Sequence, residues 1–150
     1  MNNKTITLCG STVFYDDMDD LKKQLESMGF EVLHPRDTAA DLDESIQDLH
    51  IDESHKTDMS ETGRESKYKL ILSHMNAIKQ SDMILVVNLE KNDKPSYIGG
   101  NTFLEMGFAL AYGKKIFVYN KLPDYSPYYD ELTGMLPIVI NNDLSKIKEV

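Results

Sequence analysis

The stretch DMILVVNLEKNDKPSYIGGNTFLEMGFALAYGKKIFVY, residues 82–119, holds in order a β-branched run, a glycine-rich loop, an apolar helix pattern and another β-branched run. Residues 83–88 form the most hydrophobic run of the chain. A strand that is hydrophobic throughout, followed by a helix and a second strand, is typical of a parallel sheet buried on both faces. The stretch therefore predicts an α/β fold in which residues 83–88 are the central strand and residues 102–112 a helix.

The same alternation of strand and helix continues on both sides of this stretch. Further strands are predicted at residues 5–9, 30–34, 116–119 and 138–140, and further helices at residues 16–28, 64–80 and 144–149. We therefore expect residues 1–150 to form a single domain with a five-stranded, parallel, doubly wound sheet of the flavodoxin or Rossmann-like type. In such sheets ligands bind beyond the carboxyl ends of the strands, where the strand order reverses.

Composition excludes several classes of function. Cys9 is the only cysteine among 150 residues, so the chain has no intramolecular disulfide and no cysteine cluster for a metal, and we expect no metal or other cofactor. The formal net charge of −9 argues against nucleic acid as a partner. There is no apolar run long enough to span a membrane and no signal-peptide pattern, so we expect a cytoplasmic protein that does not bind membranes.

An acidic excursion is predicted at about residues 37–63. Its local charge is −8, because Lys56 is opposed by nine acids: Asp37, Asp41, Asp43, Glu44, Asp48, Asp52, Glu53, Asp58 and Glu61. Few large apolar residues interrupt it, which is typical of a solvated surface segment or a lid. His50 and His55 could gather a metal with their acidic neighbours, but their spacing in a polar loop is weak support.

Two loops should meet at the carboxyl edge of the sheet, one after residue 9 and the other between residues 89 and 102. The substrate-binding candidates that this geometry provides are Gly10, Ser11, Thr12, Asn88, Ser96, Gly99, Gly100, Asn101 and Thr102. Glu105, in the predicted first helical turn, is the best candidate for chemistry. The alternative is a capping box, in which Glu105 bonds only to the backbone of Thr102.

Three segments together resemble the nucleoside 2-deoxyribosyltransferase family, including its relatives that hydrolyse deoxynucleoside monophosphates. They are LCGST at residues 8–12, SDMILVVN at residues 81–88 and GGNTFLEMGFALAYGKKI at residues 99–116. The resemblance implies that Glu105 is the nucleophile and that Asp82, which opens the central strand, positions or protonates the leaving base. It also implies a nucleoside or nucleotide substrate and a homo-oligomer.

The expected chemistry explains the residue types. Cleavage of an N-glycosidic bond develops positive charge at the anomeric carbon, which an ionised carboxylate can stabilise or attack. A second acid lets the base leave as a neutral molecule. Transfer to an acceptor base and hydrolysis differ only in the second half-reaction, and the sequence does not decide between them.

The chain departs from the family pattern at three positions. Thr7 stands where the family often has a tyrosine near the nucleophile, so Glu105 must be oriented by another group. Residues 12–14 replace the arginine-glycine pair of the phosphohydrolase relatives, which leaves phosphate binding by Ser11, Thr12 or Ser96 open. Gly99 replaces an aspartate of some transferases, which leaves base and sugar selection open. One of Tyr125, Tyr128 and Tyr129 could stack on a base.

Three other functions stay open at this point. A phosphoribohydrolase of the cytokinin-activating type fits less well, because GGNTFLE is one residue short of that group's motif. A non-catalytic nucleotide or nucleoside sensor would keep the fold and the pocket. An interaction protein would use the acidic segment as its partner surface. If the protein is an enzyme, we expect Glu105 to face a cavity with Asp82 across it. If it is a sensor, we expect Glu105 to be bonded to Thr102.

Overall fold

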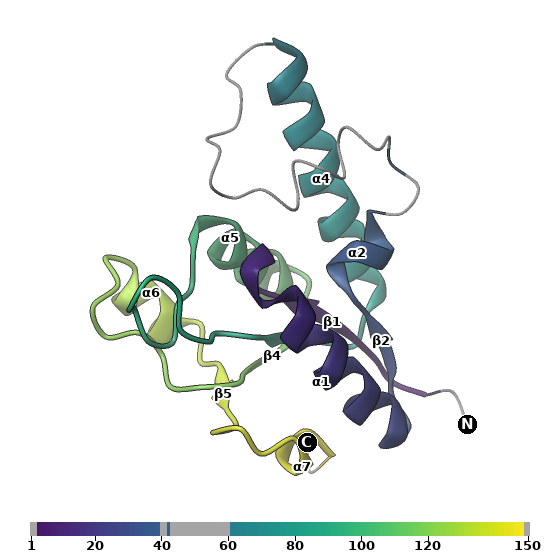
Figure 1. The fold of residues 1–150 in the computed structure, drawn as a ribbon, viewed down its shortest axis with the longest axis vertical. Helices are drawn as coiled ribbons and strands as arrows, with labels where there is room; N and C mark the ends of the chain where they lie inside the picture. Colours follow the sequence, from purple (N-terminus) through teal and green to yellow (C-terminus); the bar gives the residue numbers. More distant parts are fainter. Residues whose placement is uncertain (1–2, 40–41, 43–60, 149–150) are drawn as a thin grey trace.

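The computed structural model of the protein describes residues 3–39, 42 and 61–148. A sheet of five parallel strands lies at its centre (Figure 1). The strand order is β2-β1-β3-β4-β5, with β3 in the middle as predicted. The strands are β1 (Thr5–Cys9), β2 (Glu31–Leu33), β3 (Met83–Val86), β4 (Lys115–Val118) and β5 (Ile138–Val139). This is the order of a flavodoxin-like sheet, so the predicted fold class is confirmed.

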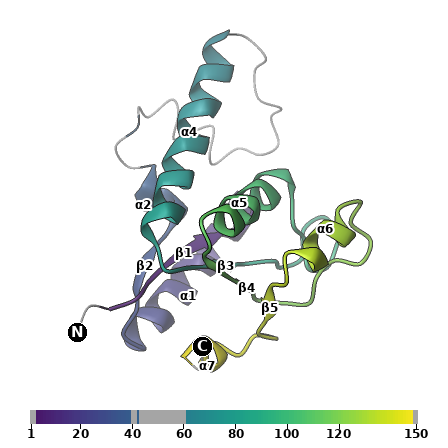
Figure 2. The same ribbon diagram turned by 180° about the vertical axis from the view of Figure 1, so that it is seen from behind.

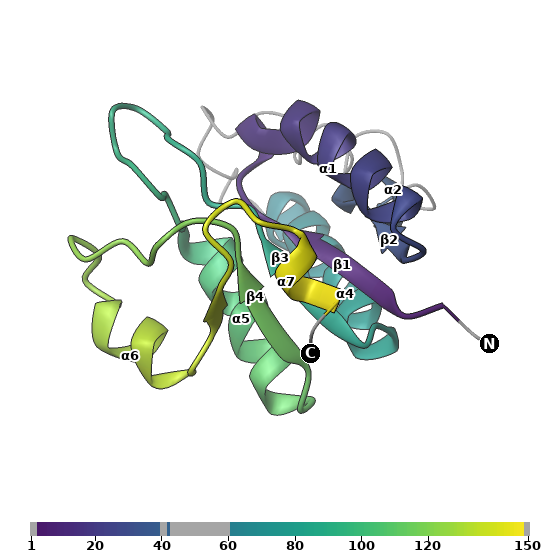
Figure 3. The same cartoon turned by 90° about the horizontal axis from the view of Figure 1, so that it is seen from below.

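Helices cover both faces of the sheet (Figures 2 and 3). Helices α1 (Tyr15–Ser27) and α7 (Ser145–Lys148) pack on one face, and α4 (Glu61–Gln80), α5 (Gly100–Ala111) and α6 (Tyr129–Gly134) on the other. The short 3-10 helix η1 (Thr12–Phe14) leads into α1, and the one-turn helix α2 (Pro35–Thr38) follows β2. The sheet is therefore doubly wound. None of the described helices is both long and apolar enough to cross a bilayer.

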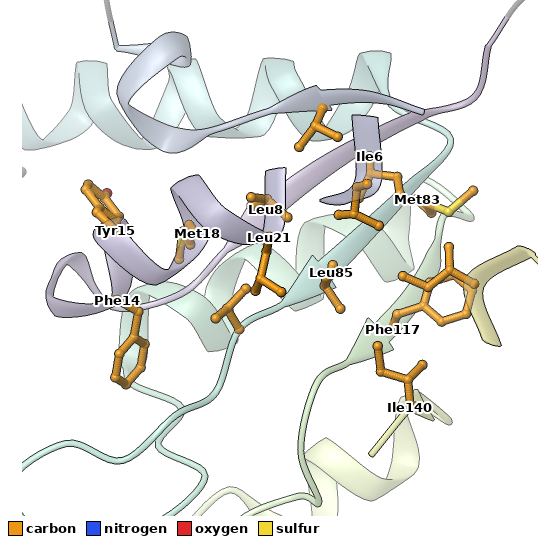
Figure 4. Packing of buried hydrophobic residues seen from close by; sticks show 14 residues of the cluster. Ile6, Leu8, Phe14, Tyr15, Met18, Leu21, Met83, Leu85, Phe117 and Ile140 are labelled. Atoms are coloured by element: carbon orange, nitrogen blue, oxygen red, sulfur yellow. The ribbon is translucent and has the colours of Figure 1, made fainter. Parts of the chain in front are cut away.

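Alternation along the strands creates two separate cores. Ile6 and Leu8 of β1 point to the α1 face, where they join Met18 and Phe117 in one cluster (Figure 4). Cys9, one residue further along, points to the opposite face and joins the cluster under α5. Because successive side chains of a strand face opposite ways, the end of β1 directs the Cys9 thiol towards α5.

Some local predictions were wrong at their boundaries. The helix expected at residues 64–80 begins at Glu61, and α5 begins at Gly100 rather than Thr102. The turn-rich stretch before β5 contains α6, which the sequence did not predict. The acidic excursion lies mostly outside the described residues, which leave out 40–41 and 43–60.

Gly10, directly after β1, is required because the backbone of β3 passes so close to it. A Cβ at this position would lie 2.7 Å from the Val87 carbonyl oxygen and 2.7 Å from the Met18 Cε. Met18 can move, but the carbonyl belongs to buried backbone at the end of β3. Gly10 thus allows the loop after β1 and the loop after β3 to run close together at the edge of the sheet.

We expect Gly10→Ala to lower the free energy of unfolding by about 1–3 kcal/mol, because the added methyl overpacks this junction. Gly107 is a matched control, since it is exposed in the middle of α5 and a Cβ there meets nothing within 4 Å. Gly107→Ala should instead raise stability by about 0.5–1 kcal/mol. Urea denaturation of both variants measures the difference, and a Gly10→Ala protein as stable as the unmodified protein would contradict the argument.

Candidate active site

A cavity of about 420 Å³ opens at the carboxyl edge of the sheet, beside β1 and β3. These strands are neighbours, but the chain leaves β1 for α1 on one face and β3 for α5 on the other, so the strand order reverses here. Eight of the eleven residues predicted for the site line the cavity: Gly10, Ser11, Thr12, Gly99, Gly100, Asn101, Thr102 and Glu105. The two predicted loops do meet.

Glu105 is the sixth residue of α5 and lies in its second turn, not in the first turn as expected. The helix begins at the N-cap Gly99, which makes no side-chain cap hydrogen bond, so Thr102 already belongs to the first turn. The capping box between Thr102 and Glu105 is therefore absent. Glu105 is buried, with 8 % of its surface exposed, and it lines the cavity.

Two side chains from other elements hold the Glu105 carboxylate. His74 Nδ1, on α4, lies 3.0 Å from Glu105 Oε1. The Cys9 thiol, at the end of β1, also hydrogen-bonds to Glu105. Thr7 does not take part, because its hydroxyl contacts Ser81 and the Ala77 carbonyl. The orienting role that a tyrosine at the position of Thr7 would have had thus falls to residues from α4 and the end of β1.

Cys9 is a hydrogen-bond donor here rather than a nucleophile. Burial raises the pKa of its thiol well above the usual value, and the Glu105 charge and the hydrogen bond to Glu105 raise it further. A thiol kept protonated can donate to a carboxylate but is a poor nucleophile. Cys9 is therefore a buried, protonated neighbour of the Glu105 carboxylate.

Asp82 does not lie across the cavity from Glu105, so this part of the prediction was wrong. Asp82 precedes β3 and accepts a hydrogen bond of 2.7 Å from the Thr5 backbone N–H at the start of β1. It is exposed and lies at the amino edge of the sheet, roughly 15 Å along the strand from the carboxyl edge. Its carboxylate joins two strand starts and is outside the cavity lining.

Asp82→Asn should accordingly leave kcat/KM for base release unchanged. The amide oxygen can still accept the Thr5 N–H, so the free energy of unfolding should fall by no more than about 1 kcal/mol. Steady-state assays and urea denaturation of the variant check both points. A loss of turnover without loss of stability would show that Asp82 takes part in the reaction.

Asn88 and Ser96 also lie outside the cavity lining. Asn88 is buried and ties the loop after β3 to the loop after β4: its amide donates to the carbonyls of Asn120 and Lys121 and accepts from the Asn120 N–H. Ser96 is buried with φ at +53°, a backbone conformation typical of tight loops. Asn88 therefore holds together the loops beside the cavity.

The sequence prediction missed several residues that line the cavity: Tyr15, Lys67, His74, Lys91 and Tyr97. His74 had a visible signal, because it lies on the inward stripe of the predicted helix, three residues after Ile71 and four before Ile78. A polar residue on such a stripe needs a partner, which α5 provides. Lys91 and Tyr97 belong to a loop whose path the sequence did not predict.

The three tyrosines near the carboxyl end of the chain lie outside the cavity lining. Tyr125 donates to the Pro95 carbonyl at 2.9 Å. The Tyr128 ring stacks on Phe103, with ring centroids 4.8 Å apart. All three remain exposed. Within this chain Tyr125 contacts the loop after β3 and Tyr128 packs on α5.

A comparison with known protein families matches most of the chain. A sequence profile described as nucleoside 2-deoxyribosyltransferase matches residues 6–135, which include both cavity loops, His74 and Glu105. The chain belongs to the nucleoside 2-deoxyribosyltransferase family. Membership supports N-glycosidase or deoxyribosyltransferase activity on nucleosides or nucleotides. No curated protein matched the chain in a separate sequence comparison.

Two solved structures share the fold of this chain. A CMP N-glycosidase from Clostridium botulinum is 21 % identical with a TM-score of 0.52, and the match covers 98 % of this chain and 100 % of that one. A 2-deoxyribosyltransferase from Bacillus psychrosaccharolyticus is 14 % identical with a TM-score of 0.51, and the match covers 90 % and 97 %. At these identities the likeness concerns the fold alone.

Proposed function

We propose that this family member breaks the N-glycosidic bond of a nucleoside or nucleotide with Glu105 as the nucleophile. One observation carries the proposal: the Glu105 carboxylate lines a cavity and is held by His74 and Cys9, which come from two other elements. Glu105 does not cap its own helix, since α5 begins without a side-chain cap hydrogen bond. A carboxylate held in this way is preorganised to meet a carbon with developing positive charge.

In the first half-reaction a Glu105 carboxylate oxygen attacks the anomeric carbon from the cavity wall. The C–N bond breaks, its electron pair leaves with the base, and the base takes up one proton from solvent. An ester between Glu105 and the sugar remains. Water then opens this ester in a hydrolase, or an acceptor base opens it in a transferase. The attacking water or base loses one proton to solvent, and either step regenerates the carboxylate.

His74 acts in this scheme through Glu105 rather than on the substrate. With the carboxylate ionised, Nδ1–H of His74 donates to Oε1, and the Cys9 S–H donates a second hydrogen bond. Two donors fix the plane of the carboxylate and leave its remaining lone pairs for the sugar. His74 is therefore a positioning residue, and its variants are expected to alter kcat.

The test is incubation of the purified protein with a panel of nucleosides, deoxynucleosides and their 5′-monophosphates, with and without an acceptor base. Released base and new nucleoside are separated by chromatography. We expect release of free base from at least one substrate class, and a new nucleoside only if the protein is a transferase. Binding of a nucleoside or nucleotide with no base release from any of them would overturn the proposal and favour a sensor.

The homo-oligomeric state implied by the family is also kept as a proposal. The exposed tyrosines described above, together with Leu104 and Leu110 of α5, place apolar surface around α5 and α6. Light scattering during size-exclusion chromatography measures the state directly, and a monomer at assay concentration would remove this proposal without affecting the chemistry.

A further inference from the structure

His34 is a buried polar side chain at the carboxyl edge of the sheet, outside the cavity lining. It follows β2 and has 2 % of its surface exposed. The residue is the N-cap of α2, because its Nδ1 accepts a hydrogen bond of 3.0 Å from the Arg36 backbone N–H. Short side chains such as those of asparagine, aspartate and serine usually fill this position. Capping alone therefore does not account for a buried imidazole here.

The other ring nitrogen of His34 holds the start of α1. His34 Nε2 lies 3.1 Å from the Tyr15 carbonyl oxygen and 3.3 Å from Asp19 Oδ1. Both of these neighbours accept hydrogen bonds, and Nδ1 is itself an acceptor, so the ring hydrogen is on Nε2 and is donated to them. The imidazole thus joins a backbone N–H of α2 to a backbone carbonyl of α1. An asparagine at this position is long enough for the first contact only.

The ring of Tyr15 is fixed by the same group of residues and lines the cavity. It meets the His34 ring edge to face, with the centroids 5.1 Å apart and the planes at 75°. The Arg36 guanidinium lies 5.3 Å from the centre of the Tyr15 ring, and Asp19 pairs with that guanidinium at 3.0 Å. Tyr15 is a buried part of the cavity wall. Helix α2, which lies beside α1 (Figure 3), therefore supports this wall from outside the cavity.

Tyr15 is also the far end of the loop after β1. Gly10, Ser11 and Thr12 of this loop line the cavity as well. The chain runs from the end of β1 through η1 to Tyr15, and the Phe14 N–H bonds back to the Ser11 carbonyl at 2.9 Å. A segment as short as residues 10–15 follows any displacement of its ends. The contacts of His34 with Tyr15 therefore help to set the position of this part of the wall.

We propose that His34 is a positioning residue for substrate binding, which acts through Tyr15 and the loop after β1 without touching the substrate. The proposal rests on the proposed function of the cavity. The groups that hold the Glu105 carboxylate do not belong to residues 10–15. A displaced wall should therefore weaken the binding of substrate and transition state to the same extent, which raises KM and leaves kcat unchanged.

Two substitutions separate the two contacts of His34. In His34→Asn the amide takes the place of Nδ1, so it can cap α2 but does not reach the Tyr15 carbonyl. In His34→Gln the amide nitrogen takes the place of Nε2, so it can donate to Tyr15 while the cap is lost. Both variants lose a buried contact and should unfold at a lower urea concentration than the unmodified protein. Loss of stability alone therefore does not distinguish them.

Steady-state kinetics on the best substrate of the panel distinguish positioning from packing. We expect KM to rise about tenfold in His34→Asn, with kcat within about threefold, and both constants to stay within about threefold in His34→Gln. Lys22→Met is the matched control and should keep the KM of the unmodified protein, because Lys22 pairs with Asp37 across the same two helices at 2.8 Å. An unchanged KM in His34→Asn, or an equal rise in KM in the Asn and Gln variants, would overturn the proposal.

Hydrogen exchange measured by mass spectrometry tests the same contacts without any need for turnover. Peptides that cover residues 10–15 should exchange about tenfold faster in His34→Asn than in His34→Gln or the unmodified protein. Equal exchange in the two variants would overturn the positioning role and leave the Glu105 chemistry standing. Faster exchange in His34→Asn alone, with no base release from any substrate, would support the positioning of the wall and overturn the proposed function.

Discussion

Glu105→Gln is expected to lower kcat for base release by roughly 10⁴-fold or more, the scale seen when an essential catalytic nucleophile is removed. The amide has nearly the size of the carboxylate but cannot form a stable ester with the sugar. Its oxygen can still accept a hydrogen bond from His74 or Cys9, so the buried site should remain packed. Base release under single-turnover conditions, with circular dichroism to check the fold, gives the result.

A direct readout of the intermediate makes this prediction sharper. Rapid acid quenching of the unmodified protein with substrate should give a protein whose mass is increased by one sugar or sugar phosphate, and peptide mapping should place it on Glu105. Glu105→Ala opens space for azide, which should restore part of the turnover and yield a glycosyl azide. Glu105→Gln with activity within tenfold of the unmodified protein, or a sugar found on another residue, would contradict the assignment.

The sequence predicted the order of the elements well because each signal was local. Alternating β-branched runs and helical stripes defined strands and helices to within a few residues. Gly29 has φ at +96° and Gly113 at +67°, as expected for residues that follow a helix. The carboxyl edge of such a sheet then gave both cavity loops. Local patterns thus predicted most of the cavity without side-chain detail.

The role of Glu105 depended on where α5 begins, and the sequence did not fix this point. Thr102 and Glu105 have capping-box spacing, but Gly99 is extended, with φ at −87° and ψ at 179°, and lets the helix start at Gly100. A glycine N-cap has no side chain to reveal it in a pattern. The start two residues earlier places Glu105 in the second turn, where its carboxylate meets His74 instead of the helix's own N-terminal backbone.

The error at Asp82 has a different origin, because strand direction alone excludes it. A residue that opens a parallel strand lies at the amino edge of the sheet, opposite to the edge where ligands bind. The resemblance to the family outweighed this argument in the prediction. His74 and Lys91 were missed because their contacts join elements that are distant in sequence, 31 residues apart for His74 and Glu105 and 80 for Lys91 and Ser11. The local periodicity of the sequence does not indicate pairs that are so far apart in the chain.

His74→Ala is expected to lower kcat by about 10²-fold, the cost of a misplaced catalytic group, because the Glu105 carboxylate loses one of its two described donors. KM should change less than kcat, since the imidazole acts on the carboxylate and not on the leaving base. Asn76→Ala is the matched control: Asn76 is exposed on the same helix and should keep full activity. Steady-state kinetics on the best substrate of the panel measures all three proteins.

His74→Asn distinguishes positioning from simple packing. The amide nitrogen of asparagine is bonded to Cγ, as Nδ1 of histidine is, so it can donate to Glu105 Oε1 from nearly the same place. We therefore expect His74→Asn to recover much of the kcat lost in His74→Ala. Equal kcat for the Ala and Asn variants would reduce His74 to a packing residue and leave Cys9 to orient the carboxylate.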